Sequence, residues 1–427
     1  MHSTPTVYAI DFGTTNSLVC AANAERTWAP LSIDPGASDP SIFRSLLFFP
    51  DDNPSIACGQ AALSACADSG MRGRLIRSLK RFLPAQTFTE TRIGTRRYAL
   101  EELVAILLRT LRERADAALS TQVRAVVLGR PVRFSDDPEC DALAAARLER
   151  AARLAGFDHV ELCEEPVAAA LDCAEQQNSS ELCAVLDLGG GTSDFTIARL
   201  GAGRSDVLAI GGIAIAGDAL DGSLMRERVS PYFGSTVRYR MPFGGNVLTF
   251  PKPLLEKMCS PAELSLLDRR EVLEFLRSIR VFSLSEEDRE RMDRLLCLVE
   301  DRLGFQIFEV IDQTKRALSA SLSAPLHFDY PGIELDEVVT RSEFEAAASR
   351  PIQSILERLE QTLERAGVGF EQLDRVYFTG GTARVPAIVQ AVSARVHPDR
   401  IQHVRTFHAV VQGLAERARQ IATELAH

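Results

Sequence analysis

The sequence lacks the features that would place a protein in a membrane, outside the cell or around a structural metal. Its longest apolar stretch, residues 207–216, is too short and too rich in glycine to span a bilayer. The first residues carry neither the basic region nor the long apolar run of a signal peptide. The nine cysteines include no C-x-x-C pair and the seven histidines show no metal-ligand spacing, so neither a disulfide framework nor a zinc site is indicated. These absences predict a cytoplasmic protein.

Positive charge and lysine are also scarce. A net charge of −10 argues against a general binder of nucleic acid or of membrane surfaces. Of the 48 basic residues only four are lysines, at positions 80, 252, 257 and 315. In a chain so biased toward arginine, a retained lysine is a candidate for a position that needs a compact ammonium group.

What the sequence does contain is a pair of similar glycine turns. Residues 184–197 are typical of a buried strand ending in Asp187, a turn of three glycines followed by Thr192, and a second strand. The three glycines leave backbone N–H groups open to a phosphate, and an aspartate at the strand end can reach a hydrated Mg²⁺. Taken alone, this stretch fits an ordinary glycine hairpin equally well.

The second copy of this pattern lies near the N-terminus, over residues 7–21. Asp11 again ends an apolar run, a glycine turn follows, and Thr14 and Thr15 precede the next apolar run. Asp187 lies 176 residues after Asp11, about the size of one domain. Because an internal repeat is a stronger signal than a single motif, we expect two similar lobes that hold one polyphosphate between them.

Further candidate residues lie in three stretches outside this repeat. Glu165 precedes Pro166 at the start of an alanine-rich helix expected over 167–176, where it acts on a bound ion or water, or only caps the helix. The turn at 380–384 is a glycine pair followed by an arginine; it either admits a base or a phosphate or is a plain surface turn. A helix over 311–319 places four polar side chains on neighbouring turns: Asp312, Lys315, Arg316 and Ser319.

Hydrophobic periodicity predicts the remaining main elements. Helices are expected over 100–119, 138–155, 342–366 and 408–426, and strands over 46–49, 123–128 and 374–379.

Taken in order, five stretches resemble the nucleotide-binding domain of the heat-shock protein 70 (DnaK-type) chaperones. They are IDFGTTNS (10–17), EEPVAAAL (164–171), LDLGGGTSD (186–194), DQTKRALS (312–319) and TGGTARVP (379–386). The resemblance covers nearly the whole chain. It implies an α/β protein with the duplicated actin, hexokinase and heat-shock ATPase fold, two lobes with a nucleotide cleft between them. Residues 78–80 and 129–131 also look like the shorter YegD-like members, which lack a client domain.

The resemblance implies ATP or ADP with Mg²⁺ as cofactors and a role for each matching residue. Phosphates would be held by Thr14, Thr15, Gly189, Gly190, Gly191 and Thr192. Asp11 and Asp187 would bind Mg²⁺ through water. Three catalytic residues are implied: Lys80 to position the attacking water, Glu165 to orient the water shell, and Asp194 to support it. The nucleoside would meet Asp312 and Lys315 at the ribose, Ser319 near the adenosine, Arg316 and Arg384 on either side of the adenine, and the glycines Gly217, Gly380 and Gly381.

The expected domain organisation follows from the same resemblance. Lobe I is expected over 1–180, with 403–427 packing back on it, and lobe II over 181–402 with an inserted, mainly helical subdomain at 223–310. Four positions depart from the family pattern: Asn16 for an aromatic residue, Ala216-Gly217 for a glycine pair, Asp312 for a glutamate, and Phe407 or His408 for an acidic residue. After Gly413 we recognise neither an apolar linker nor a β-sandwich peptide-binding domain.

The leading hypothesis is an ATP-binding, slowly ATP-hydrolysing, chaperone-related switch without a client domain. The alternative is a non-hydrolysing, nucleotide-gated protein-binding module. A small-molecule kinase of the same superfamily is less favoured because no sugar-binding aspartate motif is recognisable, and an actin-like filament because no polymer interface is. The expected partners are adenine nucleotide and a protein that senses lobe closure, with no nucleic acid and no membrane, and the expected state is a monomer.

Overall fold

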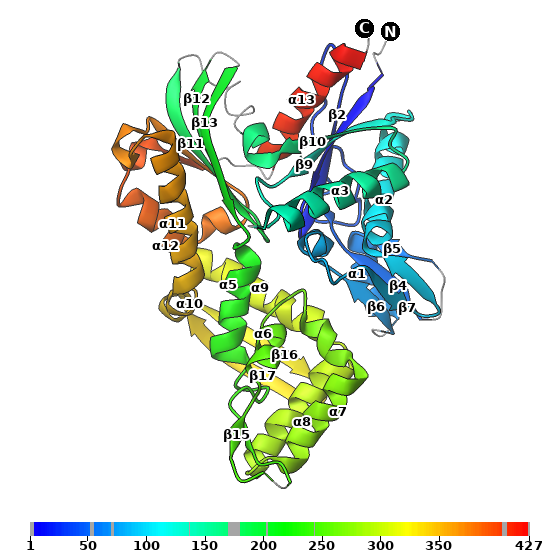
Figure 1. Ribbon diagram of the computed structural model, residues 1–427, viewed down its shortest axis with the longest axis vertical. Helices are drawn as coiled ribbons and strands as arrows, with labels where there is room; N and C mark the ends of the chain where they lie inside the picture. The colour runs from blue at the N-terminus through cyan, green and yellow to red at the C-terminus, as the bar shows by residue number, and fades with distance from the viewer. Residues whose placement is uncertain are drawn as a thin grey trace. The chain divides into compact units, whose positions relative to one another are not determined.

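The computed structural model describes residues 4–51, 55–69, 72–135, 137–169, 180–201, 204–242, 244–403 and 408–425. The chain divides into two compact units, whose elements are labelled in Figure 1. Unit 1 comprises Met1–Ala216, Ser354–Arg384 and Ile388–His427, and unit 2 comprises Gly217–Gln353 and Val385–Ala387. The lobe and subdomain boundaries expected from the sequence remain predictions.

Unit 1 contains two five-stranded sheets with the same pattern of strand directions. The first has the order β10 (His159–Glu164), β9 (Ala125–Arg130), β1 (Val7–Phe12), β2 (Asn16–Ala22) and β3 (Phe43–Arg44). The second has the order β19 (Ile401–His403), β18 (Arg375–Thr379), β11 (Glu181–Leu188), β12 (Ser193–Gly201) and β13 (Arg204–Ile213).

In each sheet a central antiparallel hairpin is extended by two parallel strands on one side and one antiparallel strand on the other. β1 pairs antiparallel with β2 and parallel with β9, and β11 pairs antiparallel with β12 and parallel with β18. The outer strands complete the match, since β9–β10 and β18–β19 are parallel while β2–β3 and β12–β13 are antiparallel. The duplicated α/β fold predicted from the two glycine turns is therefore confirmed.

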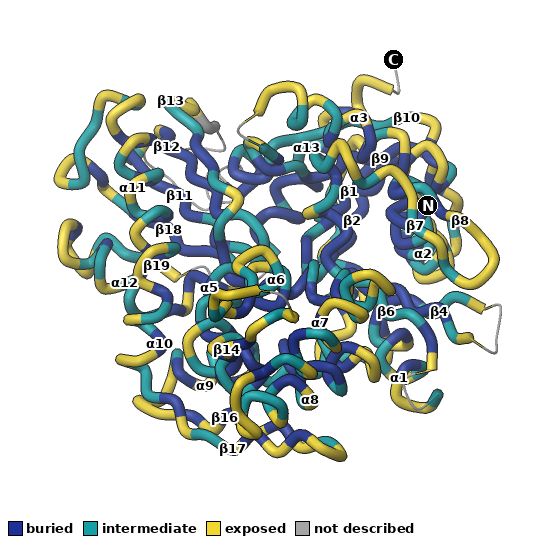
Figure 2. The backbone as a smooth tube through the Cα atoms, turned by 60° about the horizontal axis from the view of Figure 1, so that its bottom comes forward, coloured by how far each residue is buried: buried dark blue, intermediate teal, exposed yellow. Residues whose placement is uncertain are grey.

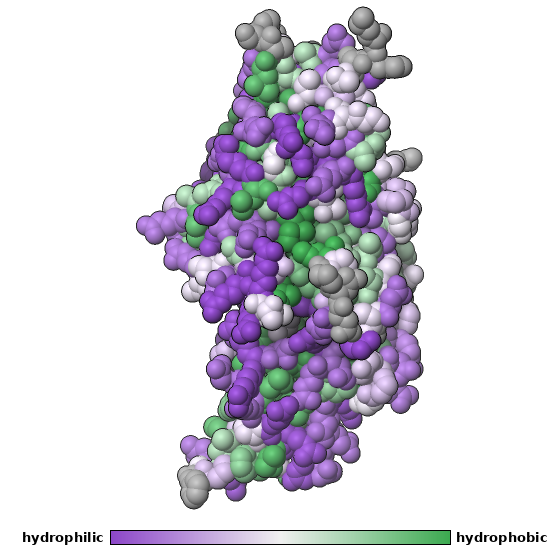
Figure 3. All heavy atoms as spheres, turned by 90° about the vertical axis from the view of Figure 1, so that its right-hand side faces the viewer, coloured by the Kyte–Doolittle hydropathy of each residue, from purple (hydrophilic) through white to green (hydrophobic). Residues whose placement is uncertain are grey.

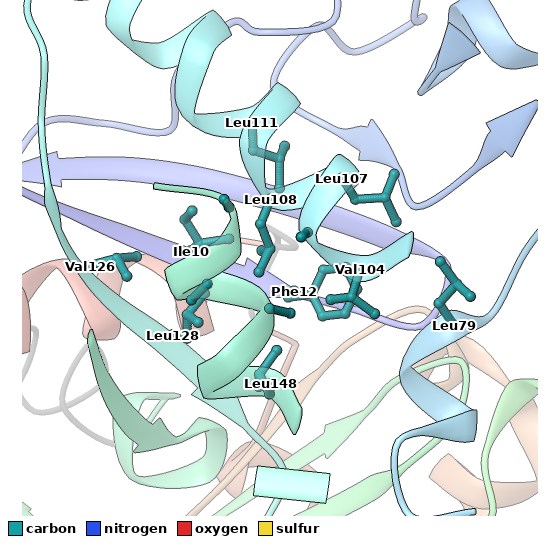
Figure 4. Close-up of a cluster of buried hydrophobic side chains, with 14 of the residues drawn as sticks. Ile10, Phe12, Leu79, Val104, Leu107, Leu108, Leu111, Val126, Leu128 and Leu148 are labelled. Atoms are coloured by element: carbon teal, nitrogen blue, oxygen red, sulfur yellow. The ribbon is translucent and has the colours of Figure 1, made fainter. Parts of the chain in front are cut away.

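Both faces of the first sheet are buried. Successive residues of β1 point to opposite faces, and each set packs into a different core cluster. Tyr8, Ile10 and Phe12 join the core cluster formed with α2 (Leu100–Leu119) and α3 (Pro138–Leu154) (Figure 4). Val7 and Ala9 join a second cluster that includes the apolar side of α13 (Ala409–Leu425). The buried central strands stand out in dark blue in Figure 2.

Several small elements precede α2. A three-stranded sheet has the order β5 (Ala57–Cys58), β4 (Leu47–Pro50) and β6 (Gly73–Ile76), next to α1 (Gln60–Asp68). A 3₁₀ helix, Leu79–Phe82, follows, and then the hairpin β7 (Glu90–Ile93) and β8 (Arg96–Ala99). Leu79 belongs to the same core cluster as Phe12 and Val104 (Figure 4), so the 3₁₀ helix is anchored by packing.

Unit 2 is mostly helical with two small hairpins. Its helices are α5 (Gly217–Leu224), α6 (Lys252–Met258), α7 (Arg270–Phe282), α8 (Glu286–Glu300), α9 (Gly304–Ala320) and α10 (Arg341–Ala347). The hairpins are β14 (Arg238–Tyr239) with β15 (Leu248–Thr249), and β16 (Ser323–Tyr330) with β17 (Ile333–Thr340).

The prediction of a single helix over 342–366 is wrong, and a proline explains the difference. The structure contains two helices there, α10 ending at Ala347 and α11 (Ser349–Ala366). In one continuous helix the ring of Pro351 would clash with the carbonyl of Ala347, four residues earlier, so the helix breaks between them.

Other expected elements differ mainly at their ends. The helix expected over 311–319 starts seven residues earlier, at Gly304, and the strand expected over 123–128 is shifted to Ala125–Arg130. The helix expected over 167–176 begins at Glu165, and its part beyond 169 lies outside the described residues, as does Phe407. Among the helices that the structure describes, none combines the length and the hydrophobicity that a membrane crossing requires.

Core packing on α2 gives a first test. Leu108 is fully buried in the cluster of Figure 4, so Leu108→Ala should lower the free energy of unfolding by about 2–5 kcal/mol through lost burial and a residual cavity. The matched control is Leu425→Ala, because Leu425 is 53% exposed at the end of α13 and its loss should cost at most about 0.5 kcal/mol. Urea unfolding followed by circular dichroism measures both, and equal losses would contradict the placement of Leu108.

Candidate functional site

The two glycine loops of the internal repeat meet in unit 1. In the second loop the N–H of Gly189 donates to the carbonyl oxygen of Thr192 at 3.0 Å, which closes a tight turn between β11 and β12. A Cβ atom placed on Gly191 would lie 2.5 Å from Oγ1 of Thr14, in the first loop. A side chain at position 191 would force Thr14 to move, so the glycine lets the backbone of the second loop lie against the Thr14 hydroxyl of the first.

The turn at 380–384 packs against the second loop. The Thr382 hydroxyl donates to the carbonyl oxygen of Gly189 at 2.7 Å. Gly380 has a φ of 86°, in the left-handed region, and a side chain there would collide with the carbonyl oxygen of Leu188. Gly380 is therefore required by the fit of this turn to the second loop.

A buried ion pair joins Lys80 to Glu165. Lys80 Nζ lies 2.5 Å from Glu165 Oε1, and the two side chains are only 6% and 7% exposed. Lys80 is carried by the 3₁₀ helix that Leu79 anchors in the core, and Glu165 is the first helical residue after β10. Two residues 85 positions apart are thus fixed by separate elements of the first sheet and its surroundings.

Three further carboxylates share this region. Burial raises the pKa of Asp11 and of Asp187 to about 8, and the charge of Glu165 adds to both shifts. Burial followed by Glu165 also raises the pKa of Asp194 to about 7, although Asp194 accepts a hydrogen bond from the N–H of Val132 at 3.1 Å. In the protein alone, nearby positive charge and hydrogen bonds therefore do not offset the cost of burying these three groups in their charged forms.

The Lys80 ammonium is the positive charge that several of these carboxylates share. Burial lowers its pKa, but the charges of Glu165 and Asp11 outweigh burial and raise the pKa overall. Lys80 is therefore protonated at neutral pH. It can donate hydrogen bonds and stabilise negative charge, but it cannot serve as a general base.

The residues present fit a hydrated divalent cation. Asp11 and Asp187 sit at corresponding places near the ends of β1 and β11. Because their pKa values are raised to about 8, a nearby cation would favour their charged forms, which are the forms that bind it. In the part of the chain that the structure describes, no three His, Cys, Asp or Glu side chains form a direct ligand set. Contacts through water are compatible with this arrangement, since Mg²⁺ commonly keeps several of its waters.

Unit 2 contains a second charged cluster, on α5 and α9. Lys315 Nζ lies 2.8 Å from Asp221 Oδ1 and 2.9 Å from Asp312 Oδ1. The other oxygen of Asp312, Oδ2, lies 2.6 Å from Nη2 of Arg316, whose side chain is 63% exposed. Burial raises the pKa of Asp221 to about 7, and Lys315 opposes that shift. Ser319 donates to the carbonyl oxygen of Lys315 at 3.4 Å, within its own helix.

The predicted site residues are thus distributed over both units. Unit 1 holds one group: Asp11, Thr14, Thr15, Lys80, Glu165, Asp187, Gly189, Gly190, Gly191, Thr192, Asp194, Gly380, Gly381 and Arg384. Unit 2 holds the other: Gly217, which begins α5, with Asp312, Lys315, Arg316 and Ser319. Because Arg316 and Arg384 belong to different units, their predicted pairing on an adenine ring remains a prediction.

Sequence reasoning missed two residues that hold these groups in place and gave a third no role. The third is Asp221, which matches the aspartate that follows the glycine pair in the family pattern and is the closest partner of Lys315. The Thr382 hydroxyl links the turn at 380–384 to the second loop by its hydrogen bond to Gly189. The backbone N–H of Val132 donates a hydrogen bond to Asp194. No local pattern marks these two contacts.

The paired sheets and the loops that join β1 to β2 and β11 to β12 define a class of protein, the actin, hexokinase and heat-shock ATPase fold. Within that class, the model of the Hsp70 protein family matches residues 79–235 and 298–423, well over half of the chain. The chain therefore belongs to the Hsp70 family. The resemblance carried by the five motifs is confirmed at this level, while the closer likeness to YegD-like members stays a prediction.

Curated relatives agree with this assignment. A chaperone protein HscA homolog from Neisseria meningitidis serogroup B is 26% identical over 97% of this chain and 58% of its own length. The chaperone protein DnaK from Thermosipho melanesiensis is 25% identical over 98% of this chain and 60% of its own length. The chain thus spans about three fifths of the length of the curated relatives that it matches.

The contact between the two loops can be tested without a ligand. Gly191→Ala should lower the free energy of unfolding by about 1–3 kcal/mol, because the new methyl group overlaps Thr14. Thr14→Ala in the same chain should recover part of that loss by removing the overlapping atoms. The control is Gly245→Ala, since no atom lies within 4 Å of a Cβ there. If the double variant is as unstable as the sum of the two single ones, the loops do not touch.

Proposed function

We propose that the protein binds MgATP and MgADP and slowly hydrolyses ATP, as a chaperone-related conformational switch. The observation that carries the proposal is the meeting of the two glycine loops at Thr14 and Gly191, beside the Lys80–Glu165 pair. Backbone amides and hydroxyls in one place suit phosphate oxygens, and a buried acidic group beside them suits the cation that accompanies a polyphosphate.

The phosphates are assigned to the loops. Gly190 and Gly191 would offer backbone N–H donors without side chains, while Gly189, whose N–H already donates to Thr192, would keep the turn tight. The hydroxyls of Thr14, Thr15 and Thr192, next to these loops in the sequence, would add further donors. Asp11 and Asp187 would hold Mg²⁺ through its waters, and the ion would supply neutralisation of the phosphate charge. Glu165 and Asp194 would orient the waters of that ion.

Lys80 is assigned to the hydrolytic step. Because it stays protonated, its role is to place a water and to stabilise the charge that develops on the phosphate oxygens. Glu165 fixes the ammonium through one of its three N–H donors, which leaves the others for water or phosphate.

The nucleoside is assigned to the cluster on α9 and to the turn at 380–384. Asp312 and Lys315 would meet the ribose, with Ser319 near the adenosine. Arg316 and Arg384 would stack on the adenine beside Gly217, Gly380 and Gly381. In the free protein Asp312 is engaged by Lys315 and Arg316, so ribose hydroxyls would have to compete with these ion pairs.

The names of the relatives extend this proposal to a chaperone system. The proposed location is the cytoplasm, and the proposed form is a monomer whose partner senses nucleotide-dependent closure. One observation favours the alternative of a non-hydrolysing nucleotide-gated module. Lys80 is already bound to a carboxylate at 2.5 Å, which reduces the donors available to an attacking water. A measurement of phosphate release from ATP distinguishes the hydrolysing switch from the non-hydrolysing module.

Ligand binding gives the first test of this function. MgATP that binds only the folded state should stabilise the protein by about 2.7 kcal/mol at a hundredfold excess over the dissociation constant. Thermal unfolding with MgATP, with ATP and EDTA, and without ligand measures this gain. Asp187→Asn should remove most of the magnesium-dependent part. An unchanged midpoint at millimolar MgATP would reject nucleotide binding.

Turnover gives the second test. Lys80→Ala should leave ATP affinity within a few-fold but reduce hydrolysis at least about tenfold, equivalent to about 1.4 kcal/mol of barrier. Because the variant leaves Glu165 buried without its partner, rates are measured where circular dichroism shows the folded protein. Lys252→Ala, at an exposed lysine on α6, is the matched control and should hydrolyse at the wild-type rate. If Lys80→Ala hydrolyses ATP at the wild-type rate, Lys80 is not the catalytic lysine. If the wild-type protein itself releases no phosphate above background, the non-hydrolysing module is the better description.

A further inference from the structure

One segment of unit 1 concentrates positive charge in a chain that is acidic overall. Residues 72–97 contain seven arginines and one lysine but a single acidic residue, Glu90, and so carry a net charge of +7. The whole chain carries −10, so the remaining residues together carry −17. Since Lys80 is buried against Glu165, the charge at the surface comes from arginine.

The hairpin β7–β8 places two of these arginines directly opposite each other. Arg92 and Arg97 are cross-strand partners, so their side chains project from the same face, and both are exposed. Arg74 of β6 donates from Nη1 to the carbonyl oxygen of Arg92 at 2.7 Å, which adds a third guanidinium. We call this set, Arg74, Arg92 and Arg97, the arginine face.

The two facing arginines of the hairpin differ in their partners. Arg97 is 73% exposed and lies 2.6 Å from Glu90, which shows that a carboxylate fits here. Arg92 turns instead to the carbonyl oxygen of Gly94, to which Nε donates at 3.0 Å. Like charges that face each other across two strands destabilise a hairpin. The sequence therefore keeps a pair that weakens the free protein, which is typical of a binding surface.

We infer that the arginine face binds an acidic segment of a partner protein. Guanidinium groups bind carboxylates through paired hydrogen bonds, and carboxylates placed between Arg92 and Arg97 would remove their repulsion. Figure 3 shows one side of the surface, which is hydrophilic over most of its area and has apolar areas near its middle.

An acidic polypeptide fits better than a nucleic acid. A short acidic segment needs only the arginine face, whereas a long polyanion would extend over the rest of a chain that carries −17. This surface is independent of the proposed nucleotide site, because none of its three arginines is among the residues assigned there.

The test uses a fluorescently labelled peptide of ten glutamates and the full chain at low salt, followed by anisotropy. The wild-type protein should bind it, and the double variant Arg92→Thr with Arg97→Thr should bind at least about tenfold more weakly. The matched control, Arg270→Thr, removes an arginine that is 89% exposed on α7 and should change the affinity less than about twofold. Arg74→Gln, a second variant, should weaken binding as well.

The thermal stability of the Arg92→Thr variant should change in the direction opposite to its peptide affinity. Arg92→Thr removes the like-charged pair and introduces a residue suited to strands, so the midpoint of thermal unfolding should rise while peptide affinity falls. A simple structural role for Arg92 would lower both. The inference is overturned if the wild-type protein does not bind the peptide, if Arg270→Thr weakens binding as much as the double variant, or if a ten-nucleotide DNA strand binds as tightly as the peptide.

Discussion

The buried contact between Lys80 and Glu165 is the constraint on which the rest of the site depends. Burying two charges is costly, and a short, well-formed contact is needed to offset that cost. Burial and then the charge of Glu165 raise the pKa values of three neighbouring carboxyl groups, those of Asp11, Asp187 and Asp194, and the Lys80 ammonium opposes these shifts. Without the ammonium, the two ends of the duplicated strands would bring acidic groups together with nothing to oppose them.

The surrounding structure holds Lys80 by its backbone rather than by its side chain alone. Ser78, buried just before the 3₁₀ helix, has a φ of 57°, a left-handed conformation that non-glycine residues adopt at a cost. After this helix, the buried guanidinium of Arg147 on α3 donates to the carbonyl oxygens of Leu83 and Ala85, each at 2.9 Å. Leu79 packs into the core between these two restraints. The position of one ammonium thus rests on strain, hydrogen bonding and packing from three parts of unit 1.

Local conflicts in this chain gather where binding is proposed. The uncompensated carboxylates near the loops, the left-handed Ser78 and the facing arginines of β7 and β8 each lower stability in the free protein. Elsewhere, local and global preferences agree: Thr340 and Glu343 form a capping box at the start of α10, and alternate residues of β16 are buried. A sequence that otherwise obeys these rules departs from them where a ligand or partner can supply the missing interaction.

The sequence by itself determined the duplicated fold and the identity of most candidate site residues. Asp11 and Asp187 each end an apolar run before a glycine turn, a pattern that only short-range preferences are needed to interpret. Tertiary structure decided which residues meet. Lys80 reaches Glu165 across 85 residues, Lys315 reaches Asp221 across 94, and the β7–β8 hairpin brings Arg92 opposite Arg97. Such contacts depend on how whole elements pack, and side-chain periodicity along one segment carries no information about the segment that it will face.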